Sequence, residues 1–450
     1  MAAPTTTPDA PVPPGTLFRF ATAGSVDDGK STLVGRMLHD AKAILADQLD
    51  QITRLSAQRG FADGEIDFAL LTDGLRAERE QGITIDVAYR YFATPARSFI
   101  LADCPGHVQY TRNMVTGAAT ADAVVVLVDA RHGVVEQTLR HLAVVALLRV
   151  AHVVVAVNKI DLLEDPQRVV ASIADEVRTT AARLGIEEVH VIPVSALRGD
   201  NVTSVSPLTP WYPGPALLPL LESLPPAQGG DGPFRLPVQL VLRPQGALGP
   251  GAEADPGAAQ RVRDYRAAAG RIASGSVRVG DPVEVFPGGA RTIVTGITVA
   301  GVASEEAVAP QSVAVELADP LDVARGALLT EPGALPAASE SIDADVFHLD
   351  QRELRTGERV LLKHGTTIVK AIVTRVRSRY DLGLLEDVPA DRLAVNDIGR
   401  ITVRLGAALP VLPYAQERAA GSFLLIDPDD GATLSGGIVR SPGAGNEDAS

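Results

Sequence analysis

Gly24-Ser25-Val26-Asp27-Asp28-Gly29-Lys30-Ser31 follows the pattern G-x-x-x-x-G-K-S, the signature of a phosphate-binding loop. The run before it, Leu17 to Ala23, has the composition of a strand, and residues 31–38 after it place apolar side chains at helical spacing. A strand, a glycine-rich loop and a helix in this order point the N-terminus of the helix at phosphate. The sequence therefore predicts a phosphate site where the first helix begins.

The residues of this loop have separate expected tasks. The glycines let the backbone turn tightly, so that successive N–H groups face phosphate oxygens. Lys30 adds a positive charge for the β- and γ-phosphates, and Ser31 offers its hydroxyl to Mg²⁺. A glycine-rich turn that binds nothing is the alternative, and the flanking strand and helix argue against it. We expect nucleotide contacts from Gly24, Ser25, Val26, Asp27, Asp28, Gly29, Lys30, Ser31 and Thr32.

Length and composition set limits on the rest of the chain. Its 450 residues are enough for about three domains of roughly 150 residues each. Hydrophobic residues make up 46% and charged residues 21%, which is typical of a globular protein with a large core. The single cysteine excludes a disulfide within the chain and suits a reducing compartment, so we expect a cytoplasmic protein. The net charge of −14 gives no general basic footprint for nucleic acid, although it leaves room for a local basic patch.

Two changes of pattern divide the chain. Strand and helix patterns alternate through residues 16–225, which predicts a parallel sheet with helices on both faces. After the Pro- and Gly-rich residues 225–233, short β-rich runs recur and predict β-barrel or sandwich material, which a second break at 332–341 divides in two. The longest apolar stretch, residues 142–157, contains Arg149 and His152 and is too short to span a membrane. We expect a disordered segment at 1–15 that is not a signal peptide, an α/β domain at 16–225, β-domains at 234–331 and 340–440, a flexible insertion at 245–260 and a disordered tail at 441–450.

A threonine before one predicted strand is a further candidate. Gly82-Ile83-Thr84-Ile85-Asp86 precedes a strand pattern at 87–92. Thr84 is placed to close over a γ-phosphate and to give its hydroxyl to Mg²⁺, although a lone threonine there is also simply a good strand former. Ser31, Thr84 and Asp103 make up the expected set of Mg²⁺ ligands.

The loop after the predicted strand at 98–103 carries the expected catalytic histidine. Asp103 can hold Mg²⁺ through water, the Gly106 N–H can meet the γ-phosphate, and His107 can reach the attacking water. A loop histidine taken alone is usually an ordinary surface residue, but its place after an Asp-x-Pro-Gly turn in a P-loop protein favours the catalytic interpretation. We expect nucleotide contacts from Asp103, Cys104, Pro105, Gly106 and His107, and catalytic roles for His107, Lys30 and Thr84.

Two more strand ends predict selectivity for guanine. In Asn158-Lys159-Ile160-Asp161, the Asp161 carboxylate can accept the N1–H and N2–H groups of guanine, and adenine lacks this pair of donors. The Lys159 stem can cover the plane of the base. Ser195-Ala196-Leu197 follows the next strand and can offer a backbone N–H to guanine O6. With the other loops, these elements predict a GTPase.

These stretches and others carry a resemblance to a known family. Asp-x-Pro-Gly-His, Gly-Ile-Thr-Ile-Asp and the β-rich second half resemble the translation-factor superfamily of GTPases. Within it, residues 16–440 are similar to the GTPase (large) subunit of bacterial ATP sulfurylase, sulfate adenylyltransferase subunit 1. Asp28 stands where elongation factors usually have histidine. The stretches that carry the closer resemblance are 27–28, 71–92, 106–118, 128–134, 199–202, 273–281 and 396–400.

The resemblance implies an α/β P-loop GTPase domain followed by two β-barrel domains. It implies that GTP hydrolysis, with Mg²⁺, drives the reaction of ATP and sulfate to adenylyl sulfate and pyrophosphate, the first step of sulfate assimilation. Adenylyl transfer occurs in the family on a smaller subunit, an ATP pyrophosphatase-type protein (sulfate adenylyltransferase subunit 2). That subunit is the implied partner, and neither nucleic acid nor a membrane is implied.

The sequence also departs from the family. Cys104 replaces a usual threonine and Val108 a usual glutamate, which bears on fine tuning rather than on function. The insertion at 245–260 is longer than the family needs, and a fused adenylylsulfate kinase domain, present in some relatives, is not expected here. The alternative is a translation elongation factor that delivers tRNA to the ribosome. Asp28, residues 109–112 and the acidic charge favour sulfate activation.

Overall fold

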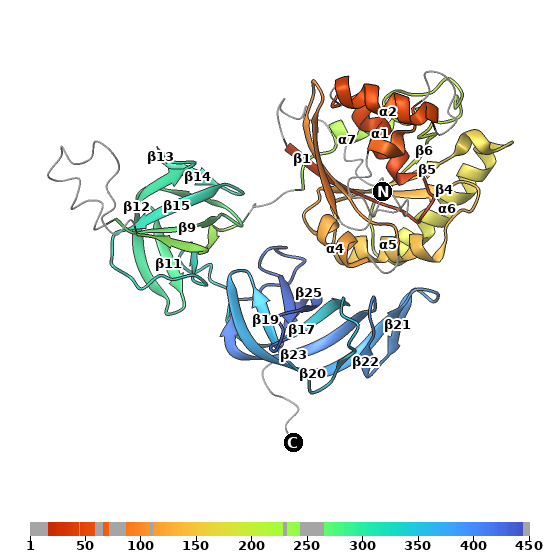
Figure 1. The fold of residues 1–450 in the computed structure, drawn as a ribbon. Coiled ribbons are helices and arrows are strands. Elements are labelled where there is room, and N and C mark those ends of the chain that lie inside the picture. The colour runs from red at the N-terminus through yellow and green to blue at the C-terminus, as the bar shows by residue number, and fades with distance from the viewer. Residues whose placement is uncertain are drawn as a thin grey trace, which may run out of the picture. The chain divides into compact units, whose positions relative to one another are not determined.

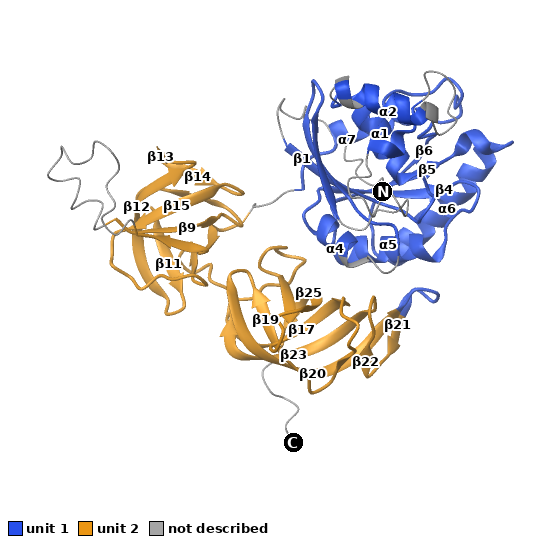
Figure 2. Cartoon of the chain, viewed as in Figure 1, with its two compact units in different colours: residues 1–227, 381–386 blue, residues 228–380, 387–450 orange. Residues whose placement is uncertain are grey.

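The computed structural model divides the chain into two compact units, which Figures 1 and 2 show. Unit 1 comprises residues 1–227 and 381–386, and unit 2 comprises residues 228–380 and 387–450. The structure describes residues 17–44, 46–58, 66–71, 87–107, 111–227, 232–243 and 265–443. The expectations for residues 1–15, for Thr84 and for the insertion at 245–260 lie outside these ranges.

A six-stranded sheet with the order β2-β3-β1-β4-β5-β6 forms the centre of unit 1. Five of its strands are parallel, as predicted, and β2 is an antiparallel edge strand. β2 runs antiparallel because a short turn, closed by a hydrogen bond from Thr94 N–H to the Arg97 carbonyl, joins it directly to β3. The strands are β1 Leu17–Ala23, β2 Ala88–Ala93, β3 Ser98–Asp103, β4 Ala123–Asp129, β5 His152–Asn158 and β6 Val189–Pro193.

Helices cover both faces of this sheet, which confirms the predicted fold class (Figure 1). On one face α1 and α7 pack against alternate residues of the strands, such as Phe20, Leu127 and Ala156. On the other face α4, α5 and α6 pack against β1, β3, β4, β5 and β6. Burial on both sides explains why β4 is a continuous apolar run. The helices are α1 Lys30–Asp40, α2 Ala46–Gln58, α4 Thr111–Ala119, α5 Glu136–Leu147, α6 Pro166–Arg183 and α7 Leu217–Ser223, with short 3₁₀ helices η1 Phe68–Leu71 and η3 Ile160–Leu162.

Unit 2 contains the two predicted β-domains. The first is a sheet with the order β7-β16-β11-β12-β15-β9-β8. An isolated β-bridge between Arg235 on β7 and Ser274, shortly after β9, brings these two parts of the sheet together. Its strands are β7 Arg235–Pro237, β8 Leu240–Leu242, β9 Ala267–Arg271, β11 Pro282–Phe286, β12 Ala290–Val299, β15 Ser312–Leu317 and β16 Leu328–Thr330, with β13 Val302–Ser304 beside β12 and the pair β10 Ser276–Arg278 and β14 Glu306–Val308.

The second β-domain is a closed barrel, because β19 at one end of the order β19-β24-β25-β17-β23-β20 also pairs with β20. Its last strand, β25, runs to Pro442, and Ser441 pairs with Asp343 on β17. The predicted start of the disordered tail at residue 441 is therefore wrong, because Ser441 and Pro442 pair with β17. The strands are β17 Ser339–His348, β19 Arg359–His364, β20 Thr367–Asp381, β23 Ile398–Leu409, β24 Ser422–Ile426 and β25 Thr433–Pro442, with β21 Glu386–Pro389 and the pair β18 Leu354–Arg355 and β22 Arg392–Leu393.

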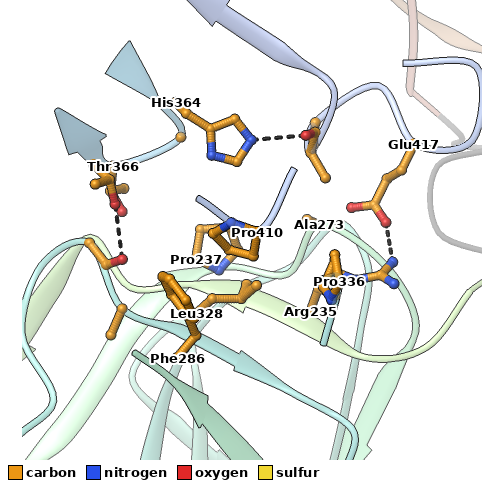
Figure 3. Close-up of a pocket in the computed structure, with 16 residues that line it drawn as sticks. Arg235, Pro237, Ala273, Phe286, Leu328, Pro336, His364, Thr366, Pro410 and Glu417 are labelled. Carbon is orange, nitrogen blue, oxygen red and sulfur yellow. Dashed lines mark hydrogen bonds and ion pairs between the residues drawn. The ribbon is translucent and has the colours of Figure 1, made fainter. Parts of the chain in front are cut away.

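A small cavity of about 50 Å³ lies inside unit 2, between its two β-domains (Figure 3). The Arg235 guanidinium from the first β-domain forms an ion pair with Glu417 from the second, and both side chains are largely buried. Thr367 Oγ1 donates to the Gly326 carbonyl at 3.0 Å across the same junction. Arg235 Nε and Glu417 Oε1 are buried and make no hydrogen bond within the described chain. An ion pair and a hydrogen bond thus join the β-domains.

None of the helices in the described ranges combines the length and the apolar character that a membrane crossing requires.

Candidate nucleotide site

The phosphate-binding loop occupies the turn between β1 and α1. Gly29 caps α1 with a φ of +88°, a left-handed conformation that favours glycine. A Cβ built on Gly29 would lie 2.4 Å from Asn158 Nδ2, so the loop also approaches the end of β5 closely. The Oγ atom of Ser25 is buried and has no partner within the described part of the chain. A left-handed glycine and an unpaired hydroxyl fit a loop that receives phosphate oxygens.

Asp103, at the end of β3, lies directly beside the lysine of this loop. Lys30 Nζ is 2.5 Å from Asp103 Oδ1, and Thr22 Oγ1 donates to the same oxygen at 3.0 Å. The Lys30 and Asp103 side chains are 7% and 2% exposed. The two groups that the sequence assigns to phosphate and to Mg²⁺ are therefore adjacent, and each neutralises the other.

The loop after Asp103 lies against the phosphate-binding loop. A Cβ built on Gly106 would lie 2.2 Å from the Gly24 carbonyl oxygen, so only glycine allows this approach. His107 follows at once and is exposed. Cys104 instead turns inward: its Sγ lies 3.6 Å from the Ala102 carbonyl oxygen, and the residue is fully buried. The structure thus brings His107 to the rim of the site and places the cysteine side chain in the core.

Asn158 connects the phosphate-binding loop to the loop after β6. Its Nδ2 group donates to the Asp28 carbonyl at 2.7 Å, and its Oδ1 accepts the Ala196 N–H at 2.9 Å. The Ala196 N–H is therefore engaged within the protein. Leu197 N–H, the next in the loop, has no partner in the described ranges. The Ser195 N–H is engaged as well, by the Asp200 carbonyl at 3.1 Å. Of the three predicted donors to guanine O6, Leu197 is thus the one whose N–H is unpaired in the described ranges.

Lys159 and Asp161 come after Asn158, and the chain turns sharply at Lys159. Lys159 has a φ of +65°, and η3 begins immediately after it. Its ammonium donates to the Asp27 carbonyl and lies 2.9 Å from Asp129 Oδ2, so its stem runs alongside the phosphate-binding loop. The Asp161 side chain is 8% exposed and lies 3.5 Å from Arg198 Nε.

Sequence reasoning missed Asp129 as an anchor of this site. It ends β4 directly beside Asn158 in the parallel register, and it receives Lys159 and both ends of the Arg131 guanidinium. Burial raises the pKa of Asp129, but the hydrogen bonds from Arg131 and Lys159 outweigh burial and hold the pKa well below its usual range. The rule that singled out Asn158, a polar residue at the end of a buried strand, applies equally to Asp129.

A second carboxylate lies within the phosphate-binding loop itself. Asp28 is 6% exposed, and its Oδ2 accepts the Ser25 N–H at 2.6 Å. Burial raises the pKa of Asp28 to about 6, against the lowering effect of that hydrogen bond. Asp28 thus changes charge near pH 6, inside the phosphate-binding loop.

The remaining predicted residues divide by exposure. Val26 is 43% exposed and Leu197 is 53% exposed, while Ser195 is fully buried beneath the turn that it begins. Ser31 and Thr32 are partly buried at the first turn of α1, and Pro105 is buried. All the described candidates follow the carboxyl ends of β1, β3, β5 and β6, and so they lie along one edge of the sheet.

Comparisons with known proteins give consistent matches. Residues 16–227 match the Elongation factor Tu GTP binding domain, and residues 341–440 match the GTP-eEF1A C-terminal domain-like family. The bifunctional enzyme CysN/CysC of Mycobacterium tuberculosis is 47% identical over 94% of this chain and 67% of its own length. Sulfate adenylyltransferase subunit 1 of Laribacter hongkongensis is 44% identical over 95% of this chain and 86% of its own length. A solved structure of sup35 complexed with GDP aligns with 96% of this chain and 95% of its own, at 20% identity and a TM-score of 0.42.

Proposed function

Because this chain belongs to the family of sulfate adenylyltransferase subunit 1, we propose that it binds GTP at the carboxyl edge of its six-stranded sheet and that hydrolysis there drives adenylyl transfer in a partner subunit. The chain is a GTP-hydrolysing subunit of sulfate activation, in which ATP and sulfate give adenylyl sulfate and pyrophosphate. The observation that carries the proposed site is the convergence of four loops, joined by the Lys30–Asp103 pair and by the two hydrogen bonds of Asn158.

At the phosphate end, Lys30 binds the β- and γ-phosphates and gives up its contact with Asp103. Ser31, Thr84 and Asp103 would hold Mg²⁺, which would supply positive charge to the phosphates. The buried Ser25 hydroxyl supports this use of the loops, because it is a donor that has no partner within the described ranges. The close approach of Gly106 to Gly24 brings the loop after β3 against the phosphate-binding loop.

At the reacting end, His107 orients the water that attacks the γ-phosphate. Phosphoryl transfer leaves little covalent work for the protein, so positioning the nucleophile is the main remaining task. The exposed place of His107 directly after Gly106 supports this role.

At the base end, Asp161 accepts the N1–H and N2–H groups of guanine, and the Leu197 N–H donates to O6. The Lys159 stem covers the base, and Asp129 holds its ammonium. A site built in this way disfavours adenine, because adenine offers the Asp161 carboxylate no pair of N–H donors.

The partner that we propose is the small, ATP pyrophosphatase-type subunit, on which adenylyl transfer takes place. The word "subunit" in the relatives' names supports a heteromer, and the cytoplasm is the compartment that suits it. A translation elongation factor is the alternative function. The alignment with sulfate-activating relatives, at 44–47% identity over 94–95% of this chain, favours sulfate activation, whereas the family models describe only the shared GTPase and barrel domains.

Copurification and coupled turnover test the proposal together. The full chain, expressed with a small adenylyltransferase subunit of the same source, should form a complex in which GTP stimulates adenylyl sulfate formation. Lys30→Ala should abolish the stimulation and leave the complex intact. Copurification of tRNA without the small subunit would instead support the elongation-factor alternative.

A further inference from the structure

A guanidinium from the first helix contacts the loop that we propose to recognise guanine. Arg36, on α1, donates through Nε–H to the Ala196 carbonyl at 3.2 Å and through a terminal N–H to the Leu197 carbonyl. Farther along the same turn, a Cβ built on Gly199 would lie 3.6 Å from Arg36 Cζ. Arg36 therefore holds two consecutive carbonyls of this turn and packs against its glycine.

The geometry of the peptide bond between Ala196 and Leu197 fixes the direction in which the Leu197 N–H points. The Ala196 carbonyl and the Leu197 N–H belong to one planar trans peptide, in which the two groups point in opposite directions. Because Arg36 binds this carbonyl from α1, the Leu197 N–H points away from α1. The N–H groups on either side of it are both engaged inside the protein, and the Leu197 N–H has no partner within the described ranges.

The guanidinium is itself held in place from its other side. Arg36 Cζ lies 4.1 Å from the centroid of the Phe68 ring, and the arginine side chain is only 17% exposed. Phe68 begins η1, which packs so closely on α1 that a Cβ built on Gly35 would lie 2.1 Å from the Phe68 carbonyl oxygen. Stacking on an aromatic ring restricts a guanidinium before it forms hydrogen bonds, so the contacts to the turn cost little further freedom.

We infer that Arg36 is a positioning residue for guanine recognition, which directs the Leu197 N–H toward O6 of the base. This inference rests on the proposed GTP site and adds a residue that touches no part of the nucleotide. Lysine matches Arg36 poorly, because its ammonium has neither the planar fork that fixes the spacing of two donors nor the flat face that stacks on Phe68. The role is specific to O6, since Asp161 is expected to bind the N1 and N2 groups.

Two nucleotide analogues separate the two ends of the base. 6-Thio-GTP differs from GTP only at position 6, where sulfur is a poor acceptor, and ITP lacks only the N2 amino group. The ratio of the dissociation constants of 6-thio-GTP and GTP therefore reports the O6 contact, and the ratio of ITP to GTP reports the Asp161 contact. A ratio measured within one variant does not depend on how stable that variant is.

Equilibrium binding of the three nucleotides to the full chain and its variants tests the inference. The unsubstituted chain should prefer GTP over 6-thio-GTP by roughly tenfold, the factor expected for one hydrogen bond. Arg36→Ala should reduce this preference to about twofold or less and leave the preference over ITP unchanged. Phe68→Leu should reduce it in part, and Arg36→Lys should fail to restore it. Arg178→Ala on α6, where the arginine contacts only exposed Asp175, is the matched control.

The possible failures are distinguishable. An Arg36→Ala chain that keeps the full preference over 6-thio-GTP overturns the inference and leaves the GTP site standing. If Arg36→Ala does not fold, full preference in Arg36→Lys overturns it equally. An unsubstituted chain that prefers GTP over neither analogue overturns the proposed base site itself, and the role of Arg36 with it.

Discussion

Lys30 Nζ lies 2.5 Å from Asp103 Oδ1, and both side chains are almost completely buried. The lysine begins α1 and the aspartate ends β3, 73 residues later, so the pair joins the two loops that we propose to hold phosphate and Mg²⁺. When GTP binds in the proposed manner, each partner must exchange the other for a ligand. The strength of this pair is therefore part of the free energy of nucleotide binding.

Removal of the lysine should affect both stability and chemistry. Lys30→Ala leaves the Asp103 carboxylate buried beside the Thr22 hydroxyl, so we expect the free energy of unfolding to fall by about 3 kcal/mol. GTP hydrolysis should be abolished, because phosphate clamps supply most of the stabilisation in this reaction. Lys30→Ala with Asp103→Asn removes the stranded charge and should recover stability without recovering hydrolysis. Denaturant titration and single-turnover hydrolysis measure the two effects, and normal hydrolysis by Lys30→Ala would contradict the phosphate-loop assignment.

Substitution of the base-recognition carboxylate should change which nucleotide is preferred. Asp161→Asn replaces one acceptor with a donor and should shift preference from GTP toward XTP, whose base presents an oxygen where guanine has its amino group. Competition binding between the two nucleotides measures the shift. Asp175→Asn, on the exposed side of α6, is the control and should leave the preference unchanged. If Asp161→Asn prefers GTP as strongly as the original chain, the assignment of Asp161 fails.

His107 should contribute to hydrolysis and little to binding. His107→Ala is expected to keep GTP affinity within a few-fold, because the phosphate-binding loop and Asp161 hold the nucleotide. Hydrolysis should fall by roughly 10²-fold or more, the range of a positioned polar catalytic group. Adenylyl sulfate yield with the partner subunit should fall in parallel. Equal losses in single-turnover hydrolysis and in equilibrium binding would show that His107 acts in folding or binding instead.

The buried carboxylate in the phosphate-binding loop should make stability depend on pH. Burial raises the pKa of Asp28 to about 6 from 3.8, so between these values the folded chain binds more protons than the unfolded chain. The free energy of unfolding should therefore decrease by about 2 kcal/mol as pH rises from about 4 to about 6 on account of this group. Asp28→Asn should remove this decrease, whereas Asp27→Asn at the exposed neighbouring position should retain it. Denaturant titrations across this pH window provide the measurement, and identical pH profiles for both variants would refute the assignment.

The ion pair beside the cavity of Figure 3 should stabilise unit 2 only while both charges are present. Glu417→Gln leaves the Arg235 guanidinium buried without its counter-charge, and we expect a loss of about 3 kcal/mol in the free energy of unfolding. The double variant Arg235→Met with Glu417→Leu removes both charges and should be close to the original stability. A single variant as stable as the double one would mean that the unpaired Arg235 charge has no cost, which contradicts the prediction.

Most of the sheet and much of the site could be predicted from the sequence, because the buried strands are apolar runs that end in a polar residue. Ser98–Asp103 and Ala123–Asp129 have the predicted bounds for this reason. The convergence of Lys30, Asp103 and Asn158 followed from the rule that parallel strands place their carboxyl ends along one edge. The strand β2 was predicted at 87–92, but its antiparallel direction was not, since the alternation of polar and apolar residues along a strand does not reveal the direction in which it pairs.

The contacts within the site depended on geometry that a linear pattern does not contain. The contact of Lys159 with Asp129 depends on the left-handed turn at Lys159, and a lysine gives no local signal for that conformation. Arg36 reaches Ala196 across 160 positions of sequence, so nothing near either residue indicates their contact. The choice of Leu197 over Ala196 as the donor to the base likewise required the position of the Asn158 side chain.

The approach of Gly106 to Gly24 limits how this site can vary. A methyl group at position 106 would come within 2.2 Å of the Gly24 oxygen, so even alanine must separate the two loops by about 1 Å. No side chain at position 106 therefore allows the distance between the two loops that glycine allows. Mutations that change the hydrolysis rate without separating the two loops should therefore lie at residues around this contact. The distance between Gly106 and Gly24 should stay the same in such variants.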